Sequence, residues 1–423
     1  MKYARLALAL GASLALAQPP HTQVSVEKSQ PQSSAFEQKL REVRFDLRVD
    51  NGRLTGSAAA VLESAIAHAK YVLIGEDHFT REIPQFATIV CDVMAGQGLS
   101  AMAVEAGPQV TEFVSSLFGK PDRLVRMGAL THQYPDSVAF LNIRQENDLA
   151  AHCSQVAHRP NFHLWGLDQE FLGSAGWLLD QILATHPGAA SSAALTRLKA
   201  EEQQAAAHAK ETGDTSKLFL FIASDSELSE VAALLHREGN SAANALFHEL
   251  IESHEIYLKN AQGSPESNEQ RARLLKQNFR QDLEAAENAQ RQRVLVKFGD
   301  WHLYKGFNPL HQRDLGNYIA ELADGEGSTS LHICVLGARG IHRIYGGYDR
   351  TSKLERFVMD DDPDYRWLKP AIDNQLPNVW TLFDLRKMRF QTLGSVDPGM
   401  ERLIYGYDLL VVVPELTPAD PIE

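Results

Sequence analysis

The stretch "YVLIGEDH", residues 71–78, gives the strongest indication of how this chain folds. Five residues that suit a buried strand are followed at once by Glu76, Asp77 and His78. The interior of a sheet disfavours two acids and an imidazole, because an unpaired buried charge is costly. The stretch "VLVKFGDWH", residues 294–302, repeats the pattern far along the chain. Both stretches therefore predict a buried strand that ends in side chains suited to catalysis or ligand binding.

Apolar runs of this kind recur and are separated by helical patterns. The expected strands cover residues 71–75, 101–107, 162–168, 294–300, 330–340 and 407–416. The helical patterns include residues 82–96, 175–186 and 309–323. Strands that alternate with helices predict an α/β fold, with a mainly parallel sheet and helices on both faces.

One long stretch departs from this alternation. No strand pattern occurs between residues 188 and 293, where Ala, Glu, Gln, Lys and Leu dominate. Such a composition predicts a large helical insertion made of several long helices. We expect a single α/β domain over residues 41–423 that contains this insertion.

The beginning of the chain has the features of a targeting segment. Residues 1–17 combine a basic start, an apolar stretch and a small-x-small cleavage site, which predicts a secretory signal peptide. Residues 18–40 are rich in Pro, Ser and Gln and predict a flexible leader. We therefore expect an exported protein, periplasmic or extracellular. No later stretch approaches twenty apolar residues, so no membrane span is expected.

The overall composition narrows the range of expected binding partners. The chain has 423 residues and a formal net charge of −13. An acidic balance argues against nucleic acid, because phosphate binding needs clustered Lys and Arg. The three cysteines Cys91, Cys153 and Cys334 can form at most one pair. We interpret them as buried apolar residues rather than as metal ligands, since none lies in a CxxC motif.

The polar ends of the strands predict one common site. Ligands of open parallel sheets bind beyond the carboxyl ends of the strands, which lie at the same edge. Four expected strands carry polar residues there. In chain order these are Glu76, Asp77 and His78; Glu105; Asp168, Gln169 and Glu170; and Asp300 and His302.

Two chemistries suit these side chains, and the residue types do not separate them. In the first, His78 is a general base assisted by Glu76 or Asp77, and His302 or an arginine stabilises the oxyanion. In the second, His78, Glu105 and His302 hold one divalent transition metal such as zinc or manganese, which activates the water.

Several other catalytic motifs are excluded. The stretch "HELIESH", residues 248–254, resembles a zincin motif, but its histidines are six positions apart and do not share one helix face. The chain contains no GxSxG elbow, Walker A loop or GxGxxG motif. A serine hydrolase, an NTPase or a dinucleotide enzyme is therefore not indicated.

The motifs resemble those of the erythromycin-esterase-like family. The stretches that carry the resemblance, in order, are "LIGEDHFTREIPQF" (73–86), "AVEAG" (103–107), "LWGLDQE" (164–170), "QRARLLKQNF" (270–279) and "VKFGDWHLYKG" (296–306). The repeated Gly-x-x-His pattern, "GEDH" and "GDWH", is also similar to the Tiki/TraB and haem-uptake group. One residue separates Glu76 from His78, where the esterases have two, and this spacing favours the metal interpretation.

The resemblance implies a polar cleft above the sheet and a set of site residues. The implied catalytic residues are Glu76, His78, Glu105, Arg271 and His302, and the implied substrate-binding residues are Asp168, Gln169, Asn278 and Lys305. The expected function is an exported hydrolase that cleaves an ester or amide bond in a small-molecule or peptide substrate. The alternative is a protein that binds haem or another small ligand in the same cleft without turnover.

Overall fold

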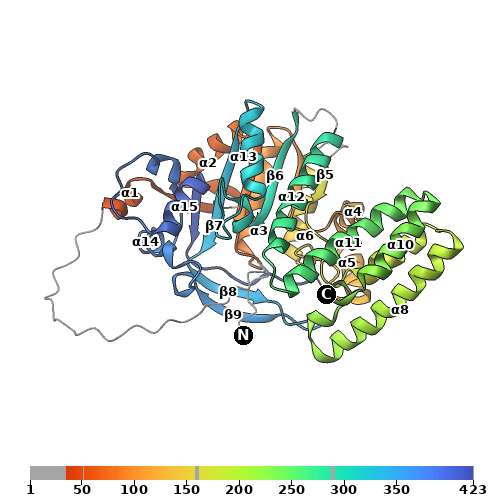
Figure 1. The fold of residues 1–423 in the computed structure, drawn as a ribbon. Coiled ribbons are helices and arrows are strands. Elements are labelled where there is room, and N and C mark those ends of the chain that lie inside the picture. Colours follow the sequence, from red (N-terminus) through yellow and green to blue (C-terminus); the bar gives the residue numbers. More distant parts are fainter. Residues whose placement is uncertain (1–34, 51, 158–161, 287–290, 423) are drawn as a thin grey trace, which may run out of the picture.

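The computed structural model describes residues 35–50, 52–157, 162–286 and 291–422 (Figure 1). Its strands, in chain order, are β1 (Arg44–Asp50), β2 (Arg53–Thr55), β3 (Tyr71–Glu76), β4 (Leu99–Val104), β5 (His163–Gly166), β6 (Arg293–Gly299), β7 (Ser330–Gly337), β8 (Arg339–Ile344), β9 (Lys353–Val358), β10 (Trp380–Asp384) and β11 (Leu409–Val413).

Helices surround these strands. They are α1 (Ala35–Glu42), α2 (Ser57–His68), α3 (Glu82–Ala95), α4 (Pro108–Ser116), α5 (Arg123–Gln133), α6 (Arg144–Val156), α7 (Ala175–Ala184), α8 (Ala189–Thr212), α9 (Phe219–Ile222), α10 (Asp225–Glu238), α11 (Ser241–Ala261), α12 (Glu266–Ala285), α13 (Leu315–Gly325), α14 (Lys369–Asp373) and α15 (Pro398–Gly406).

The sheet confirms the predicted fold class. Among the described residues nine strands pair in the order β2-β1-β10-β11-β7-β3-β6-β4-β5. The run from β11 to β5 is parallel throughout, while β10, β1 and β2 add an antiparallel edge. The strands β8 and β9 form a separate hairpin. The chain is thus an α/β protein with a mainly parallel sheet.

Side chains of β3 alternate between two cores, which shows that both faces of the sheet are covered. Val72 and Ile74 pack in a cluster with α2, α3 and α6. Tyr71 and Leu73 pack in a second cluster with α12, α13 and α15. All of these side chains are fully buried, so β3 is apolar at every position before its tip.

The helical insertion lies between β5 and β6. From α7 to α12 the described residues contain helices and connecting loops without a strand. Figure 1 shows α8, α10 and α11 together at one end of the molecule, opposite α1. The last helix of the insertion, α12, returns to the sheet and packs beside α13 (Figure 1).

Several boundaries differ from the sequence prediction. The predicted leader ends within α1, because Phe36 and Leu40 are buried in the second core. The stretch predicted as one strand over 330–340 is divided between β7 and β8. The helix predicted from residue 309 begins at Leu315, capped by the side chain of Asp314. Residues 1–34, which include the predicted signal peptide, lie outside the described residues.

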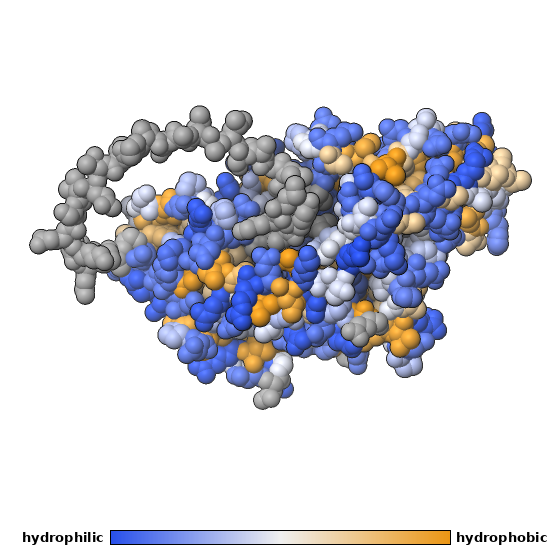
Figure 2. Space-filling view, turned by 90° about the horizontal axis from the view of Figure 1, so that it is seen from below, coloured by the Kyte–Doolittle hydropathy of each residue, from blue (hydrophilic) through white to orange (hydrophobic). Residues whose placement is uncertain are grey.

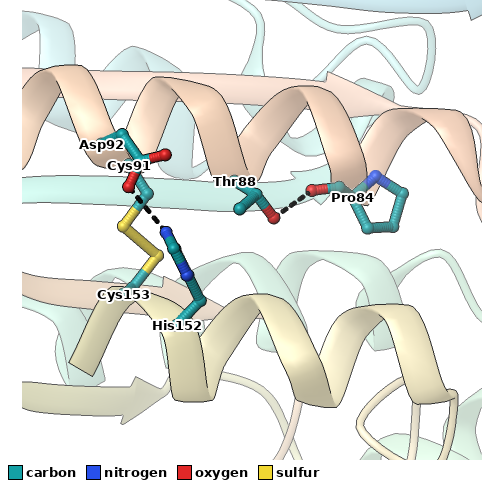
Figure 3. The surroundings of a disulfide bond; sticks show 6 residues. All are labelled: Pro84, Thr88, Cys91, Asp92, His152 and Cys153. Carbon is teal, nitrogen blue, oxygen red and sulfur yellow. Dashed lines mark hydrogen bonds and ion pairs between the residues drawn. A yellow bond between two sulfur atoms is a disulfide. The ribbon is translucent and has the colours of Figure 1, made fainter. Parts of the chain in front are cut away.

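Two of the three cysteines form a disulfide. Cys91 of α3 and Cys153 of α6 are linked, with their Cα atoms 5.7 Å apart (Figure 3). The sequence allowed at most one pair and left its formation open, and the structure shows this pair. Cys334, buried in β7, is free. The disulfide joins two helices that pack in the same core on one face of the sheet.

The surface is mainly hydrophilic (Figure 2). Hydrophilic residues dominate the face drawn in Figure 2, and hydrophobic residues occur between them in small groups. None of the helices in the described parts of the chain combines the length and apolar character needed to cross a bilayer.

Candidate active site

The register of the parallel strands brings four polar strand ends together. Glu76 of β3 lies beside Gly299 of β6, and Val104 of β4 lies beside Gly166 of β5. Since β6 also pairs with β4, the ends of β3, β6, β4 and β5 are neighbours along one edge. The side chains that follow these ends converge there, as the sequence predicted.

His78 is held between two carboxylates. Its Nδ1 lies 2.9 Å from Oε1 of Glu76, and its Nε2 lies 3.4 Å from Oε2 of Glu105. About 22% of the His78 side chain is exposed, so small molecules in solvent can reach the ring. Gly299 allows this position, because a Cβ atom there would lie 2.9 Å from Nε2 of His78.

His302 has the same arrangement on the other side of Glu105. Its Nδ1 lies 2.8 Å from Oδ2 of Asp314, and its Nε2 lies 3.6 Å from Oε1 of Glu105. A carboxylate on Nδ1 fixes the tautomer and the orientation of an imidazole. Two carboxylate–imidazole pairs therefore direct their Nε2 atoms toward one carboxylate.

Glu105 is the centre of the site, and other groups hold both of its oxygens. The backbone amide of Gly299 donates to Oε2 at 2.7 Å, and Nη2 of Arg271 donates to Oε1 at 2.7 Å. These contacts keep the carboxylate between the two imidazoles. The position of Glu105 is thus fixed by two elements, the end of β6 through Gly299 and the helical insertion through Arg271.

Arg271 and Asn278 reach the rim from α12. They are two helical turns apart and therefore lie on one face of the helix. Arg271 binds Asp168 with Nε at 2.9 Å and Nη2 at 2.5 Å, and Asn278 donates to the carbonyl of Leu167 at 2.9 Å. Arg271 thus bridges two carboxylates and positions Glu105, rather than presenting a free guanidinium to an oxyanion.

A buried lysine that the sequence analysis did not select supports Glu76. Lys297, in the middle of β6, contacts Oε1 of Glu76 at 2.5 Å and Oε1 of Glu146 of α6 at 2.6 Å. A lysine within the apolar run "VLVKFG" was a signal for a buried ion pair. Glu146 and Asp314 carried no such signal, because helices and loops commonly present acidic residues to solvent.

The charges shift the pKa values of both histidines upward. Burial disfavours the charged ring of His78, but Glu105 and Glu76 outweigh it and raise the pKa to about 10. Burial likewise opposes the charge on His302, while Asp314 and Glu105 raise its pKa. Burial raises the pKa of Glu105, yet His78, His302 and Arg271 hold it well below its usual value. The resting site therefore contains a protonated His78 beside an ionised Glu105.

The flanking carboxyl groups respond differently to burial. Burial raises the pKa of Glu146 to about 7, although Lys297 opposes the rise. For Glu76, Lys297 and His78 outweigh burial and lower the pKa. Lys297 therefore pairs with the ionised carboxylate of Glu76 and with the carboxyl group of Glu146, which titrates near neutral pH.

Two phenylalanines border the imidazole of His78. The ring of Phe140 stacks on it with centroids 4.2 Å apart and an angle of 28°. Phe79 lies next to both rings, 6.0 Å from His78 and 5.4 Å from Phe140. Both phenylalanines are partly exposed, so an apolar surface lies beside the reactive nitrogen.

Other predicted residues take different positions. Asp77 faces His342 of β8, with Oδ2 3.7 Å from Nδ1. Lys305 binds Asp408 at 2.7 Å, and the same carboxylate accepts from the backbone amide of His332 near the start of β7. Lys305 is therefore paired away from the carboxyl ends of the strands.

The remaining residues of this set lie beside the cluster. Gln169 is buried next to Asp168, whose Oδ1 accepts its backbone amide. Glu170 accepts from the amide of Gln109 at the start of α4 at 2.6 Å. Asp300 accepts from the hydroxyl of Tyr365 at 2.7 Å. These contacts position the loops around the site.

The predicted ligand set of His78, Glu105 and His302 does not fit a divalent metal. Within the described residues, no group of three or more His, Cys, Asp or Glu side chains is arranged to hold one. Both oxygens of Glu105 already accept hydrogen bonds, one from Arg271 and one from the backbone amide of Gly299. The contacts suit acid–base chemistry instead.

The arrangement of the sheet and its rim defines an erythromycin-esterase-like fold. A mutant of the erythromycin esterase EreC in its open conformation superposes with a TM-score of 0.57 at 15% identity, covering 90% of this chain and 99% of that chain. A succinoglycan biosynthesis protein gives a TM-score of 0.56 at 16% identity, covering 92% and 98%. A protein from Bacillus cereus gives 0.55 at 13% identity, covering 91% and 98%.

These likenesses establish the fold. No protein-family model matches the sequence, and no curated protein matches it. The likeness to the Tiki/TraB and haem-uptake group that the Gly-x-x-His pattern suggested stays a prediction.

Proposed function

We propose that this protein is a hydrolase that cleaves an ester or amide bond with a water molecule activated by His78, without a metal. The observation that carries the proposal is the pair of carboxylate–imidazole units, Glu76–His78 and Asp314–His302, whose Nε2 atoms face the same carboxylate. The fold shared with erythromycin esterase EreC supports the reaction class.

The two imidazoles suit different roles. His78 is the more exposed ring, so a water molecule can approach its Nε2. In the minor fraction without a proton on Nε2, His78 takes a proton from water as the water oxygen attacks the carbonyl carbon. His302, whose pKa is raised by Asp314 and Glu105 against the effect of burial, donates from Nε2 to the developing oxyanion. The tetrahedral intermediate then collapses, and the bond between the carbonyl carbon and the leaving oxygen or nitrogen breaks. The leaving atom takes the proton that His78 received from water, so the acid and the alcohol or amine are released and His78 is neutral again.

Glu105 and Arg271 act on the imidazoles rather than on the carbonyl group. Glu105 contacts both Nε2 atoms and so orients the two rings, and Arg271 fixes Glu105. The high pKa of His78 makes its neutral form scarce near neutral pH but strongly basic, so the reaction should be faster in alkaline solution.

We further propose that the protein is exported. Residues 1–17 have the pattern of a signal peptide. The disulfide between Cys91 and Cys153 supports this location, because such bonds persist in oxidising compartments. Fractionation of cells that produce the full chain, followed by N-terminal sequencing of the mature protein, tests this part of the proposal.

The catalytic proposal is tested with purified protein and a panel of esters, lactones and anilides. Erythromycin belongs in the panel because a structural neighbour is an esterase of that compound. We expect turnover that survives a chelator and falls at least about a hundredfold in His78→Gln and His302→Gln. His208→Gln, which removes an exposed imidazole from α8, is the matched control. Full activity in both site variants, or activity abolished by the chelator, would contradict the mechanism.

A further inference from the structure

The last described residues bind the two loops that border His78. Residues 417–422, here called the C-terminal strap, follow β11 and the loop after it. The strap forms isolated β-bridges with two separate loops, Thr80 with Pro418 and Ile143 with Pro421. The first loop follows His78, and the second follows Phe140. One short segment therefore connects both loops that surround the imidazole.

Backbone hydrogen bonds reinforce each bridge. On the first loop, Arg81 donates to the carbonyl of Thr417 at 3.0 Å, and Ala419 donates to the carbonyl of Phe79 at 3.0 Å. On the second loop, Arg144 donates to the carbonyl of Asp420 at 2.8 Å. The amide of Ile422 donates to the carbonyl of Asn142, also at 2.8 Å.

The two phenylalanines need such support. Phe79 has φ of 66° and Phe140 has φ of 52°, both in the left-handed region that residues other than glycine rarely adopt. Backbone in this region persists only where the surrounding structure holds it. The strap supplies that hold, because it bonds to the carbonyl of Phe79 itself and to the chain just after Phe140.

One side chain of the strap joins the two loops. Oδ1 of Asp420 accepts from Nη2 of Arg81 at 2.5 Å, and Oδ2 accepts from Nε2 of Gln145 at 2.7 Å. Gln145 accepts in return from the amide of Asp420 at 2.9 Å. Arg81 precedes α3 and Gln145 lies in the first turn of α6, so the carboxylate also sits near two helix N-termini, where a negative charge is favourable.

We propose that Asp420 is a positioning residue of the site, which holds Phe79 and Phe140 against His78 through the C-terminal strap. Stacking on Phe140 fixes the plane of the imidazole, and Glu76 fixes its rotation within that plane. Loss of the strap contacts would leave the ring held by Glu76 and Glu105 at its edge, without the stacked ring that fixes its plane. The role in turnover rests on the proposed hydrolysis, whereas the role in positioning does not.

The test compares Asp420→Ala with Glu415→Ala in the full chain. Glu415 is the matched control, because it lies on the same terminal segment and makes only a 4.0 Å exposed ion pair with Arg339. Hydrogen exchange should become about tenfold faster for the amides of residues 79–81 and 140–144 in Asp420→Ala, with β3 and β6 unchanged. Glu415→Ala should match the wild type. If Asp420→Ala does not fold, Asp420→Asn removes the charge and the acceptor for Gln145 while retaining an acceptor for Arg81.

A second measurement follows the imidazole directly. With 13C-labelled histidine, the ring protons of His78, assigned by their loss in His78→Gln, should move downfield in Asp420→Ala as the ring current of Phe140 is lost. Unchanged exchange in both loops, or an unchanged His78 resonance, would overturn the proposal. In a protein that hydrolyses an ester, kcat should fall in Asp420→Ala, and an unchanged kcat would overturn the role in turnover. A wild type without hydrolysis would refute the proposed function, while exchange and resonance would still decide the positioning.

Discussion

Replacing Glu105 by Gln should lower the pKa of His78 from about 10 to near the ordinary value of 6.5. Nε2 of His78 lies 3.4 Å from Oε2 of Glu105, and a unit charge at that distance is worth about 5 kcal/mol at an effective dielectric constant of about 20. The rise of the His78 pKa corresponds to roughly the same free energy, about 5 kcal/mol. The Glu105 charge is thus large enough to cause the rise, while burial and Glu76 oppose each other.

The assay is the pH dependence of kcat/KM together with an NMR titration of His78. In the wild type, kcat/KM should rise about tenfold per pH unit from neutral pH and level off near pH 10, because only the neutral ring accepts a proton. In Glu105→Gln the pH at which kcat/KM levels off should lie near neutral. Gln can still accept from the amide of Gly299, and Arg271 keeps Asp168, so the local structure should persist.

Stability should change in the same window. The native wild type retains the proton of His78 up to about pH 10, whereas the unfolded chain releases it near 6.5. The contribution of His78 to the unfolding free energy is therefore complete below pH 6.5 and is lost as the pH rises to about 10. Glu105→Gln should remove most of this loss, which urea unfolding at several pH values measures.

Glu170→Gln also removes a buried carboxylate at a strand end, but this carboxylate binds the amide of Gln109 and should leave the titration of His78 unchanged. A His78 pKa that stays within one unit of 10 in Glu105→Gln would refute the reasoning, since the charge assigned to the shift would then not cause it.

Three further predictions concern stability. Lys297→Met should lower the unfolding free energy, measured in urea, by about 3–5 kcal/mol, because it leaves two buried carboxylates without their cation. Adding Glu146→Gln should restore part of this loss, and strictly additive effects of the two substitutions would contradict the shared ion pair. Burial raises the pKa of Glu170 to about 8, above its unfolded value of 4.5. The contribution of Glu170 to stability should therefore decline as the pH rises from 4.5 to about 8, and thermal unfolding of Glu170→Gln should lack this decline. The disulfide between Cys91 and Cys153 closes a loop of 62 residues, so replacing both cysteines by Ser should lower the unfolding free energy by about 4 kcal/mol. Equal stability of the wild type in reducing and oxidising buffer would show that the disulfide does not stabilise the fold.

The parallel part of the sheet could be predicted because its strands are continuous apolar runs. Strands buried on both faces, such as β3 and β4, need apolar residues at every position, and that pattern is visible without coordinates. The strands β1 and β10 were missed. The residues of β1 alternate between polar and apolar, as in "RFDLRVD", so β1 lacks the continuous apolar run by which the other strands were found.

The site was predicted only as far as it lies at strand ends. Glu76, His78, Glu105 and His302 follow apolar runs, and the parallel arrangement brings them to one edge. Asp314 could not be found in this way, because it precedes a helix and meets its imidazole only after the chain turns back along the sheet.

What could be read from the order of residues is the set of groups available for chemistry and the edge at which they gather, because hydrophobic periodicity and strand direction are local properties of the chain. Which charge meets which was settled by contacts between distant segments. Arg271 comes to Glu105 from an inserted helix, and Asp420 comes to Arg81 from the end of the chain. Such contacts depend on distances in space and on the loss of solvent around each charge, and neither quantity is encoded in a short stretch of sequence.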